Sequence, residues 1–214
     1  FRSTLTLIIC LFMLFYFFSI FLPAKIIDAI PHEAKLISRG LDFGYTNDPS
    51  AVVDIYRYNG GYIFDELLYQ KGLSNKQIAD ILKEFPPVLI KADSAEPKSI
   101  DELKLYGISV IGAAKGQGSV NQGIQNIQDK RISVTKHSVN IIKEYRNYLW
   151  KTDREGKKLN EPMGIWDHCM DAIRYGMPVV FFMTDEKRQE LEFERVMREK
   201  RLRSKQKSGI MNMA

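Results

Sequence analysis

The chain has 214 residues, of which 45% are hydrophobic and 27% charged, and it carries a net charge of +5 with an isoelectric point near 9.1. These values are ordinary for a globular protein, and the length suffices for one domain with a full core. Two cysteines, Cys10 and Cys169, exclude a disulfide framework and favour a reducing compartment, while the mild basic charge permits an anionic partner without requiring one.

The N-terminal residues differ in character from the rest of the chain. Residues 5–22, LTLIICLFMLFYFFSIFL, are apolar and uncharged over a length that fits a membrane span or a signal-type segment. A segment foreign to the domain is a third interpretation, because the pattern of a cleavage site is weak before Ala24 and the chain starts at Phe1. We therefore keep residues 1–24 apart from the domain and leave membrane attachment through residues 5–22 open.

From residue 35 the pattern indicates a mixed α/β domain. KLISRGLDFGY (35–45) predicts a first strand. Two further strands, at 51–58 and 62–69, flank Asn59-Gly60-Gly61, a strong signal for a tight turn, and so predict an antiparallel hairpin.

The remainder of the domain alternates between helices and strands. Ser74 and Gln77 form an S-x-x-Q capping box at the start of a helix over 75–85. A polar loop is expected at 152–162. The other predicted strands are 87–94, 108–114 and 131–136, and the other predicted helices are 97–107, 119–128, 138–150 and 164–177. This order predicts a mixed sheet with an antiparallel edge and helices packed on it.

The domain is expected to span residues 35–183. Residues 184–214 then form a tail that mixes basic and acidic side chains, a pattern typical of a solvated helix. Alternatively, this tail binds an anionic surface.

Three aspartates occupy positions where a core residue is expected. Asp42 lies within the first strand, Asp93 lies near the end of the strand at 87–94, and Asp171 lies in the last helix. If the two strands are neighbours and the helix crosses the sheet, the three carboxylates converge, and their mutual repulsion requires cations. Oxygen ligands suit Mg²⁺ or Mn²⁺, and two such ions support phosphodiester hydrolysis.

Each of these residues also has a structural interpretation. Asp93 could cap a helix or form a turn before Pro97. His168 and Asp171 share one helix face, and a surface hydrogen-bonded pair would explain them equally well, with Asp167 able to replace His168. Asp42 is the hardest to explain structurally, because aspartate is disfavoured within strands.

Three stretches occur together in an order that suggests a family. They are GLDFGYTNDPSAV (40–52), IKADSAEP (90–97) and a block from SVIGAAKGQGSVNQGI through EYRNYLW to DHCMDAIRYG (109–176). Together they resemble the C-terminal nuclease domain of the phage terminase large subunit. The resemblance covers about residues 35–177, and it implies an RNase H-like fold that cuts double-stranded DNA during genome packaging.

The resemblance also implies roles for individual residues. Asp42, Asp93 and Asp171 match the three acids that hold two Mg²⁺ or Mn²⁺ ions, and His168 matches a histidine one turn before the third acid. His168 would orient that acid or assist the leaving group. Glu96 stays outside the predicted site, because a carboxylate at a helix N-terminus needs no further role. The implied partners are the phage portal and the terminase small subunit, and the implied compartment is the host cytoplasm.

DNA contact is expected at the loop 114–119, AKGQGS. Its glycines let a phosphate approach the backbone, Lys115 adds a positive charge, and a helix starts at its end. An ordinary flexible loop is the alternative. Contacts to the DNA backbone rather than to bases should dominate.

The sequence departs from a complete terminase large subunit in lacking an ATPase motor. No G-x-x-x-x-G-K-[ST] motif is present, so we expect a detached nuclease domain or the remnant of a split gene. Three alternatives to the terminase interpretation stay open. They are a resolvase- or transposase-type nuclease of the same fold, an inactive membrane-anchored module, and an actin-like ATPase, for which Asp42 to Thr46 would be the first phosphate loop.

Overall fold

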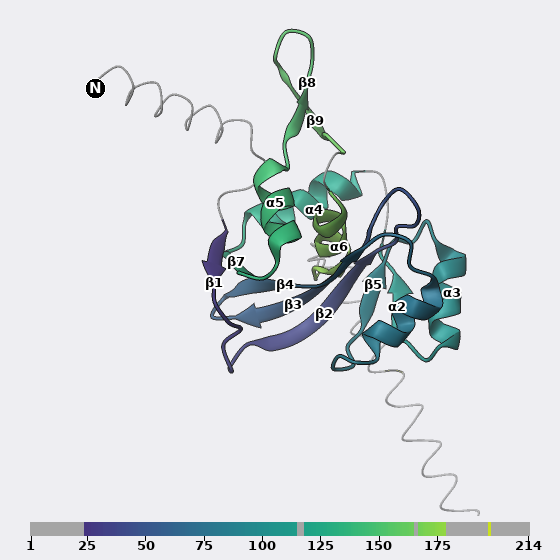
Figure 1. Ribbon diagram of the computed structural model, residues 1–214. Coiled ribbons are helices and arrows are strands. Elements are labelled where there is room, and N and C mark those ends of the chain that lie inside the picture. The colour runs from purple at the N-terminus through teal and green to yellow at the C-terminus, as the bar shows by residue number, and fades with distance from the viewer. Residues whose placement is uncertain (1–23, 115–117, 165–166, 179–196, 198–214) are drawn as a thin grey trace, which may run out of the picture. The chain divides into compact units, whose positions relative to one another are not determined.

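The computed structural model describes residues 24–114, 118–164, 167–178 and 197 (Figure 1). The chain divides into two units, Phe1–Val179 and Val180–Ala214, and the fold below is that of the first. Nearly all of the two segments separated above, 1–24 and 184–214, lies outside the described residues. No helix within the described residues is long and apolar enough to cross a bilayer, and the run at 5–22 is not among them.

A seven-stranded mixed sheet forms the centre of the domain, with the strand order β1-β7-β4-β3-β2-β5-β6. The pairs β2–β3 and β3–β4 are antiparallel, and the other pairs are parallel. Asn59 and Gly60 join β3 to β4 with positive φ angles of 44° and 73°, as the sequence of this turn predicts. The strands are β1 (Lys25–Ile27), β2 (Lys35–Asp42), β3 (Ser50–Tyr58), β4 (Gly61–Gln70), β5 (Ile90–Ala92), β6 (Val110–Gly112) and β7 (Ile132–Thr135).

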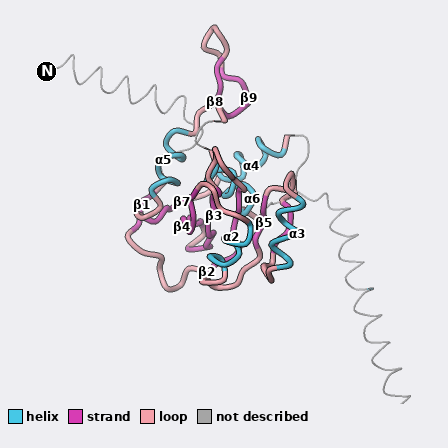
Figure 2. Tube along the Cα trace, turned by 45° about the vertical axis from the view of Figure 1, so that its right-hand side comes forward, coloured by secondary structure: helices cyan, strands magenta, loops and turns pink. Residues whose placement is uncertain are grey.

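Helices cover both faces of this sheet (Figures 1 and 2). On one face α4, α5 and α6 pack on inward side chains of β3, β4 and β7, and on the other α2 and α3 pack on β2, β5 and β6. The two cores alternate along β3, where Ala51 and Val53 belong to the first and Val52 to the second. The helices are α2 (Asn75–Leu82), α3 (Pro97–Leu105), α4 (Ser119–Gln128), α5 (Val139–Asn147) and α6 (His168–Gly176).

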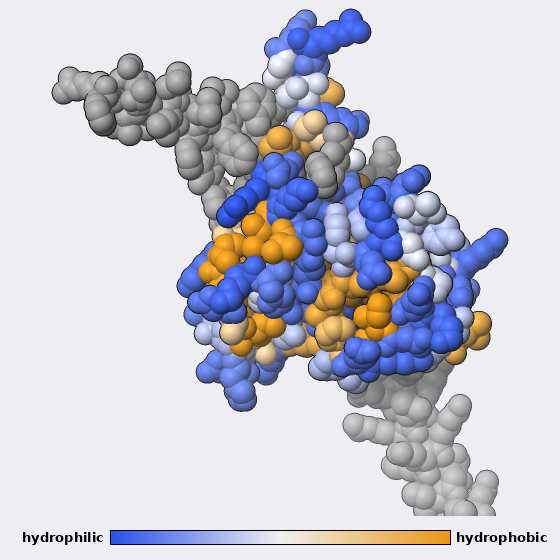
Figure 3. Space-filling model, in the orientation of Figure 1, coloured by the Kyte–Doolittle hydropathy of each residue, from blue (hydrophilic) through white to orange (hydrophobic). Residues whose placement is uncertain are grey.

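Two predictions about the C-terminal half were wrong in detail. The expected loop is an antiparallel hairpin of β8 (Trp150–Thr152) and β9 (Lys158–Pro162). The Asp153 side chain accepts backbone hydrogen bonds from Glu155 and Lys157, so local turn chemistry closes a segment that lacks an apolar pattern. The end of this hairpin is hydrophilic (Figure 3).

The last helix begins four residues later than expected. Gly164, the predicted first residue, has a φ angle of 66°, which lies outside the right-handed helical region, and α6 starts at His168. Strand β1 was not predicted either, because three residues are too few to show a periodic pattern. The capping box at Ser74 and Gln77 is confirmed, with both reciprocal hydrogen bonds present.

Candidate active site

Two of the predicted acids lie side by side at the ends of neighbouring strands. β2 and β5 are parallel, with Leu41 opposite Ala92, and the Asp93 amide donates to the Leu41 carbonyl at 3.3 Å. Asp42 ends β2 and Asp93 follows β5, so both carboxylates project from the same edge of the sheet. The Asp42 side chain is buried, with the residue 9% exposed.

Close backbone packing holds α6 against the sheet. A Cβ on Gly40 would stand 1.8 Å from the Ala172 carbonyl oxygen, and one on Gly176 would stand 2.9 Å from the Gly40 nitrogen. The Ser38 hydroxyl donates to the Gly176 carbonyl at 2.8 Å. Only glycine permits this approach, and the resulting contact carries His168 and Asp171 to the strand ends.

His168 contacts the acid of the first strand. Its Nδ1 lies 3.1 Å from Asp42 Oδ2, and its Nε2 lies 3.7 Å from Asp48 Oδ1. Burial, together with the charges of Asp171 and Asp93, raises the pKa of Asp42 to about 6, while the His168 hydrogen bond opposes this shift. The hydrogen bond to Asp42 in turn raises the pKa of His168. This electrostatic coupling shows that the three carboxylates share one neighbourhood.

The third acid is engaged by its own helix. Asp171 accepts from Arg174 at two atoms, with Nη2 2.9 Å from Oδ2 and Nε 3.3 Å from Oδ1. The Tyr175 hydroxyl lies 3.3 Å from Asp171 Oδ2 and 3.1 Å from Asp93 Oδ2, bridging the two acids. Neither Arg174 nor Tyr175 was predicted, although their spacings of three and four residues from Asp171 are those of helical neighbours.

Asp93 combines the two interpretations that the sequence left open. Its Oδ1 accepts from the Ala95 amide at 2.7 Å, as in a turn, while Oδ2 faces Tyr175. It is not the N-cap of α3, because that position belongs to Glu96, which makes no side-chain capping bond.

Glu144 on α5 supports the start of α6 and was not predicted. Its Oε2 accepts from the backbone amides of Cys169 and Met170 at 2.7 and 3.2 Å, whereas the N-cap residue Asp167 makes no side-chain capping bond. Burial raises the pKa of Glu144 to about 7, against the opposing effects of the Tyr69 hydroxyl and the two amides. Only the contact between the two folded helices reveals this role.

The three carboxylates at this site are chemically suited to bind a divalent cation. Asp42, Asp93 and Asp171 offer carboxylate oxygens, the ligands that Mg²⁺ and Mn²⁺ prefer. Within the described part of the chain, no three acidic, histidine or cysteine side chains are already arranged around one point where an ion would sit. A cation therefore requires side-chain adjustment, above all at Asp171. Lys115, the predicted DNA contact, lies outside the described residues.

The sheet order and the crossing helix are those of an RNase H-like domain. The chain belongs to the terminase RNase H-like domain family, whose profile matches residues 42–179. It is 38% identical over 159 residues to the terminase large subunit of Bacillus phage SPP1, which covers 70% of this chain and 37% of that protein. The PBSX phage terminase large subunit of Bacillus subtilis (strain 168) is 32% identical over 168 residues, 70% of this chain and 38% of that protein.

Solved structures agree with this assignment. The nuclease domain of the large terminase from bacteriophage SPP1, solved with bound Mn, matches with a TM-score of 0.63 and 30% identity over 72% of this chain and 95% of that one. The P22 large terminase nuclease domain shares the fold, with a TM-score of 0.58, 20% identity and coverage of 73% and 89%. The chain spans just over a third of the length of the curated relatives, and it corresponds to their nuclease domain.

Proposed function

We propose that this chain is a divalent-metal-dependent endonuclease domain that cuts concatemeric double-stranded viral DNA during genome packaging. The observation that carries the proposal is the convergence of Asp42, Asp93 and Asp171 at one sheet edge. There, burial and the charges of Asp171 and Asp93 raise the pKa of Asp42. A buried acid whose pKa is raised beside two further carboxylates is the electrostatic setting of a cation site. The Mn bound in the SPP1 nuclease domain supports the same choice of ion.

In this proposal Asp42, Asp93 and Asp171 hold two Mg²⁺ or Mn²⁺ ions. Such ions, when bound, activate a water and stabilise the leaving oxygen of a phosphodiester. His168 fixes the orientation of Asp42 through Nδ1, and in its protonated form it carries a proton that the leaving oxygen can receive. Glu144 holds the first turn of α6, which fixes the position of His168 relative to β2.

The wider assignments belong to the same proposal. The nuclease domain, expected at residues 35–183, is extended to residue 25 because β1 pairs with β7 in the same sheet, and it is flanked by the apolar segment 1–24 and the charged tail 184–214. The loop that contains Lys115 contacts DNA phosphates. The portal, the terminase small subunit and an ATPase motor complete the packaging machine, and cutting takes place in the host cytoplasm. Their support is the family membership of the chain.

The test is cleavage of supercoiled plasmid DNA by the purified chain in the presence of Mn²⁺. We expect nicked and linear products from the wild-type protein and none after chelation with EDTA. Asp42→Asn and Asp93→Asn should each abolish cleavage. Asp101→Asn, which changes an exposed acid on α3, should leave it intact. Cleavage that survives both site substitutions would refute the metal site.

A further inference from the structure

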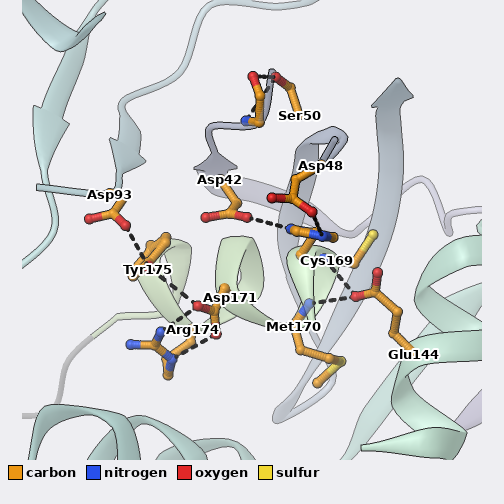
Figure 4. Close-up of polar contacts among 12 residues, drawn as sticks. Asp42, Asp48, Ser50, Asp93, Glu144, Cys169, Met170, Asp171, Arg174 and Tyr175 are labelled. Atoms are coloured by element: carbon orange, nitrogen blue, oxygen red, sulfur yellow. Dashed lines mark hydrogen bonds and ion pairs between the residues drawn. The ribbon is translucent and has the colours of Figure 1, made fainter. Parts of the chain in front are cut away.

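The ion pair between Arg174 and Asp171 uses both oxygens of a carboxylate assigned to the metal site. The Arg174 side chain is 9% exposed and that of Asp171 is 24% exposed, so neither belongs to an open surface pair. The guanidinium group also lies over the Tyr175 ring, with Cζ 4.7 Å from the ring centroid. These contacts place a fixed positive charge inside a group of acids (Figure 4).

A glycine in the neighbouring helix makes room for this arginine. A Cβ on Gly123 of α4 would stand 2.5 Å from Arg174 Cγ and 2.8 Å from Cδ. Glycine within a helix is unfavourable, because it leaves the backbone more freedom to lose on folding. The presence of glycine at position 123 is therefore explained by packing, because it leaves a slot through which the aliphatic part of the Arg174 side chain reaches Asp171.

We propose that Arg174 is an exchangeable counter-ion of Asp171, which it neutralises in the metal-free protein and releases to a divalent cation when the site is loaded. This inference rests on the proposed function. Arg174 is a positioning residue, since it acts through Asp171. The described acids lie near one another, and yet no three of them surround one point where an ion would sit. The exchange explains this arrangement, because both carboxylate oxygens of Asp171 face the Arg174 guanidinium instead of a common metal position.

The exchange has a direct consequence for metal affinity. A cation that binds Asp171 must displace the guanidinium and also tolerate a nearby positive charge, and both effects weaken binding. Removing the arginine charge should therefore strengthen metal binding even though it destabilises the metal-free protein. If Arg174 only maintained the structure, its replacement would weaken both metal binding and the stability of the metal-free protein.

The experiment measures the Mn²⁺ dissociation constant by titration calorimetry and the melting temperature in EDTA, using the full chain. For Arg174→Gln we expect Mn²⁺ affinity to rise on the order of three- to tenfold and the melting temperature to fall. Arg174→Lys keeps the charge but loses the two-atom contact, so its Mn²⁺ affinity should lie between that of the wild-type protein and that of Arg174→Gln. Arg146→Gln, an exposed arginine in the last turn of α5, is the matched control and should change neither quantity.

A second variant tests the same exchange without changing any charge. Gly123→Ala fills the slot and pushes the arginine stem away from Asp171, so Mn²⁺ affinity should rise in the same direction as in Arg174→Gln. This variant carries the test if Arg174→Gln does not fold. An unchanged or weaker affinity in the folded variants overturns the inference.

Asp42→Asn separates this inference from the proposed function. If the wild-type chain binds Mn²⁺ and Asp42→Asn weakens that binding, the metal site stands, and the arginine and glycine variants alone decide the exchange. If the wild-type chain does not bind Mn²⁺, or Asp42→Asn binds it as well as wild type, the metal site and the exchange are both refuted.

Discussion

Strand β2 carries two buried charged side chains that point to opposite faces of the sheet and have opposite surroundings. Arg39 forms a two-atom ion pair with Asp54 of β3, at 2.5 and 3.0 Å, and its guanidinium lies over the Phe85 ring. Both partners are 2% exposed. Asp42, three residues further on, has a hydrogen bond to His168 and two other aspartates as electrostatic neighbours.

The difference separates a structural charge from a reactive one. Asp54 has a dedicated cation of matching geometry, so no further partner is needed, and its ion pair links two strands. Asp42 is held beside groups of its own sign, an arrangement that destabilises the protein unless a cation joins it. Asp54 on β3 is thus an internal control for Asp42 on β2, since both acids are buried and only Asp42 lies at the proposed site.

The largest effect should come from Asp42. Asp42→Asn removes a proposed ligand, and cleavage of plasmid DNA should fall by about a thousandfold or more, a loss of roughly 4 kcal/mol in barrier lowering. Because the substitution also relieves like-charge repulsion, the free energy of unfolding in EDTA should stay level or increase. Activity is measured by plasmid nicking and stability by urea unfolding. A variant that loses stability and activity together would contradict this assignment.

Asp54 should behave in the opposite way. Asp54→Asn leaves the Arg39 guanidinium buried without its carboxylate, and we expect the free energy of unfolding to drop by about 3–5 kcal/mol. Cleavage per folded molecule should be retained. The double substitution Arg39→Met with Asp54→Leu removes both charges and should recover much of the lost stability. If Asp54→Asn left stability unchanged while abolishing cleavage, the comparison between the two acids would fail.

Gly40 affects both stability and the proposed site, because it lies in β2 between Arg39 and Asp42 and contacts α6. In Gly40→Ala the new methyl group would overlap the Ala172 carbonyl, and α6 must move away from the sheet. We expect a loss of about 3 kcal/mol in the free energy of unfolding, at the upper end of overpacking effects. Cleavage should also fall in the folded fraction, since His168 moves with the helix. Equal cleavage per folded molecule would show that the site tolerates this shift.

Much of this fold follows from local sequence patterns. The hairpin turn at Asn59-Gly60, the capping box at Ser74, and the alternation of strands and helices arise from neighbouring residues, and the structure confirms them. Strand β1 could not be predicted, because its pairing with β7 is its defining feature and joins residues far apart in sequence. The hairpin β8–β9 was missed for a related reason, since polar strands lack a hydrophobic period.

The candidate site divides in the same manner. Asp42, Asp93, His168 and Asp171 were identified from sequence, and the structure places the four at one sheet edge. Their roles stay predictions. Glu144 could not be found from sequence, because a glutamate in an amphipathic helix is normally solvent-exposed and only the packing of α5 on α6 turns it inward. Arg174 depends likewise on a glycine in another helix.

Glu144 gives the smallest predicted effect and a further contrast with Asp54. It is 1% exposed, and among the described residues no arginine pairs with it as Arg39 pairs with Asp54; Oε2 accepts from two backbone amides, and the Tyr69 hydroxyl also contacts the carboxylate. Its pKa is raised from 4.5 to about 7, so the folded protein binds a proton more tightly than the unfolded chain does. The resulting stabilisation is complete below about pH 4.5 and is lost as the pH rises through 7.

Glu144→Gln should remove this dependence, because the amide oxygen can still accept from Cys169 and Met170 but does not titrate. The free energy of unfolding of wild type should fall between pH 5 and pH 7 by about 2 kcal/mol more than that of the variant. Asp42, whose pKa is raised to about 6, also titrates in this range, but it is present in both proteins, so the difference between the two urea-unfolding series isolates Glu144. Parallel pH profiles would mean that Glu144 remains ionised in the folded protein, held by the two amides at the start of α6.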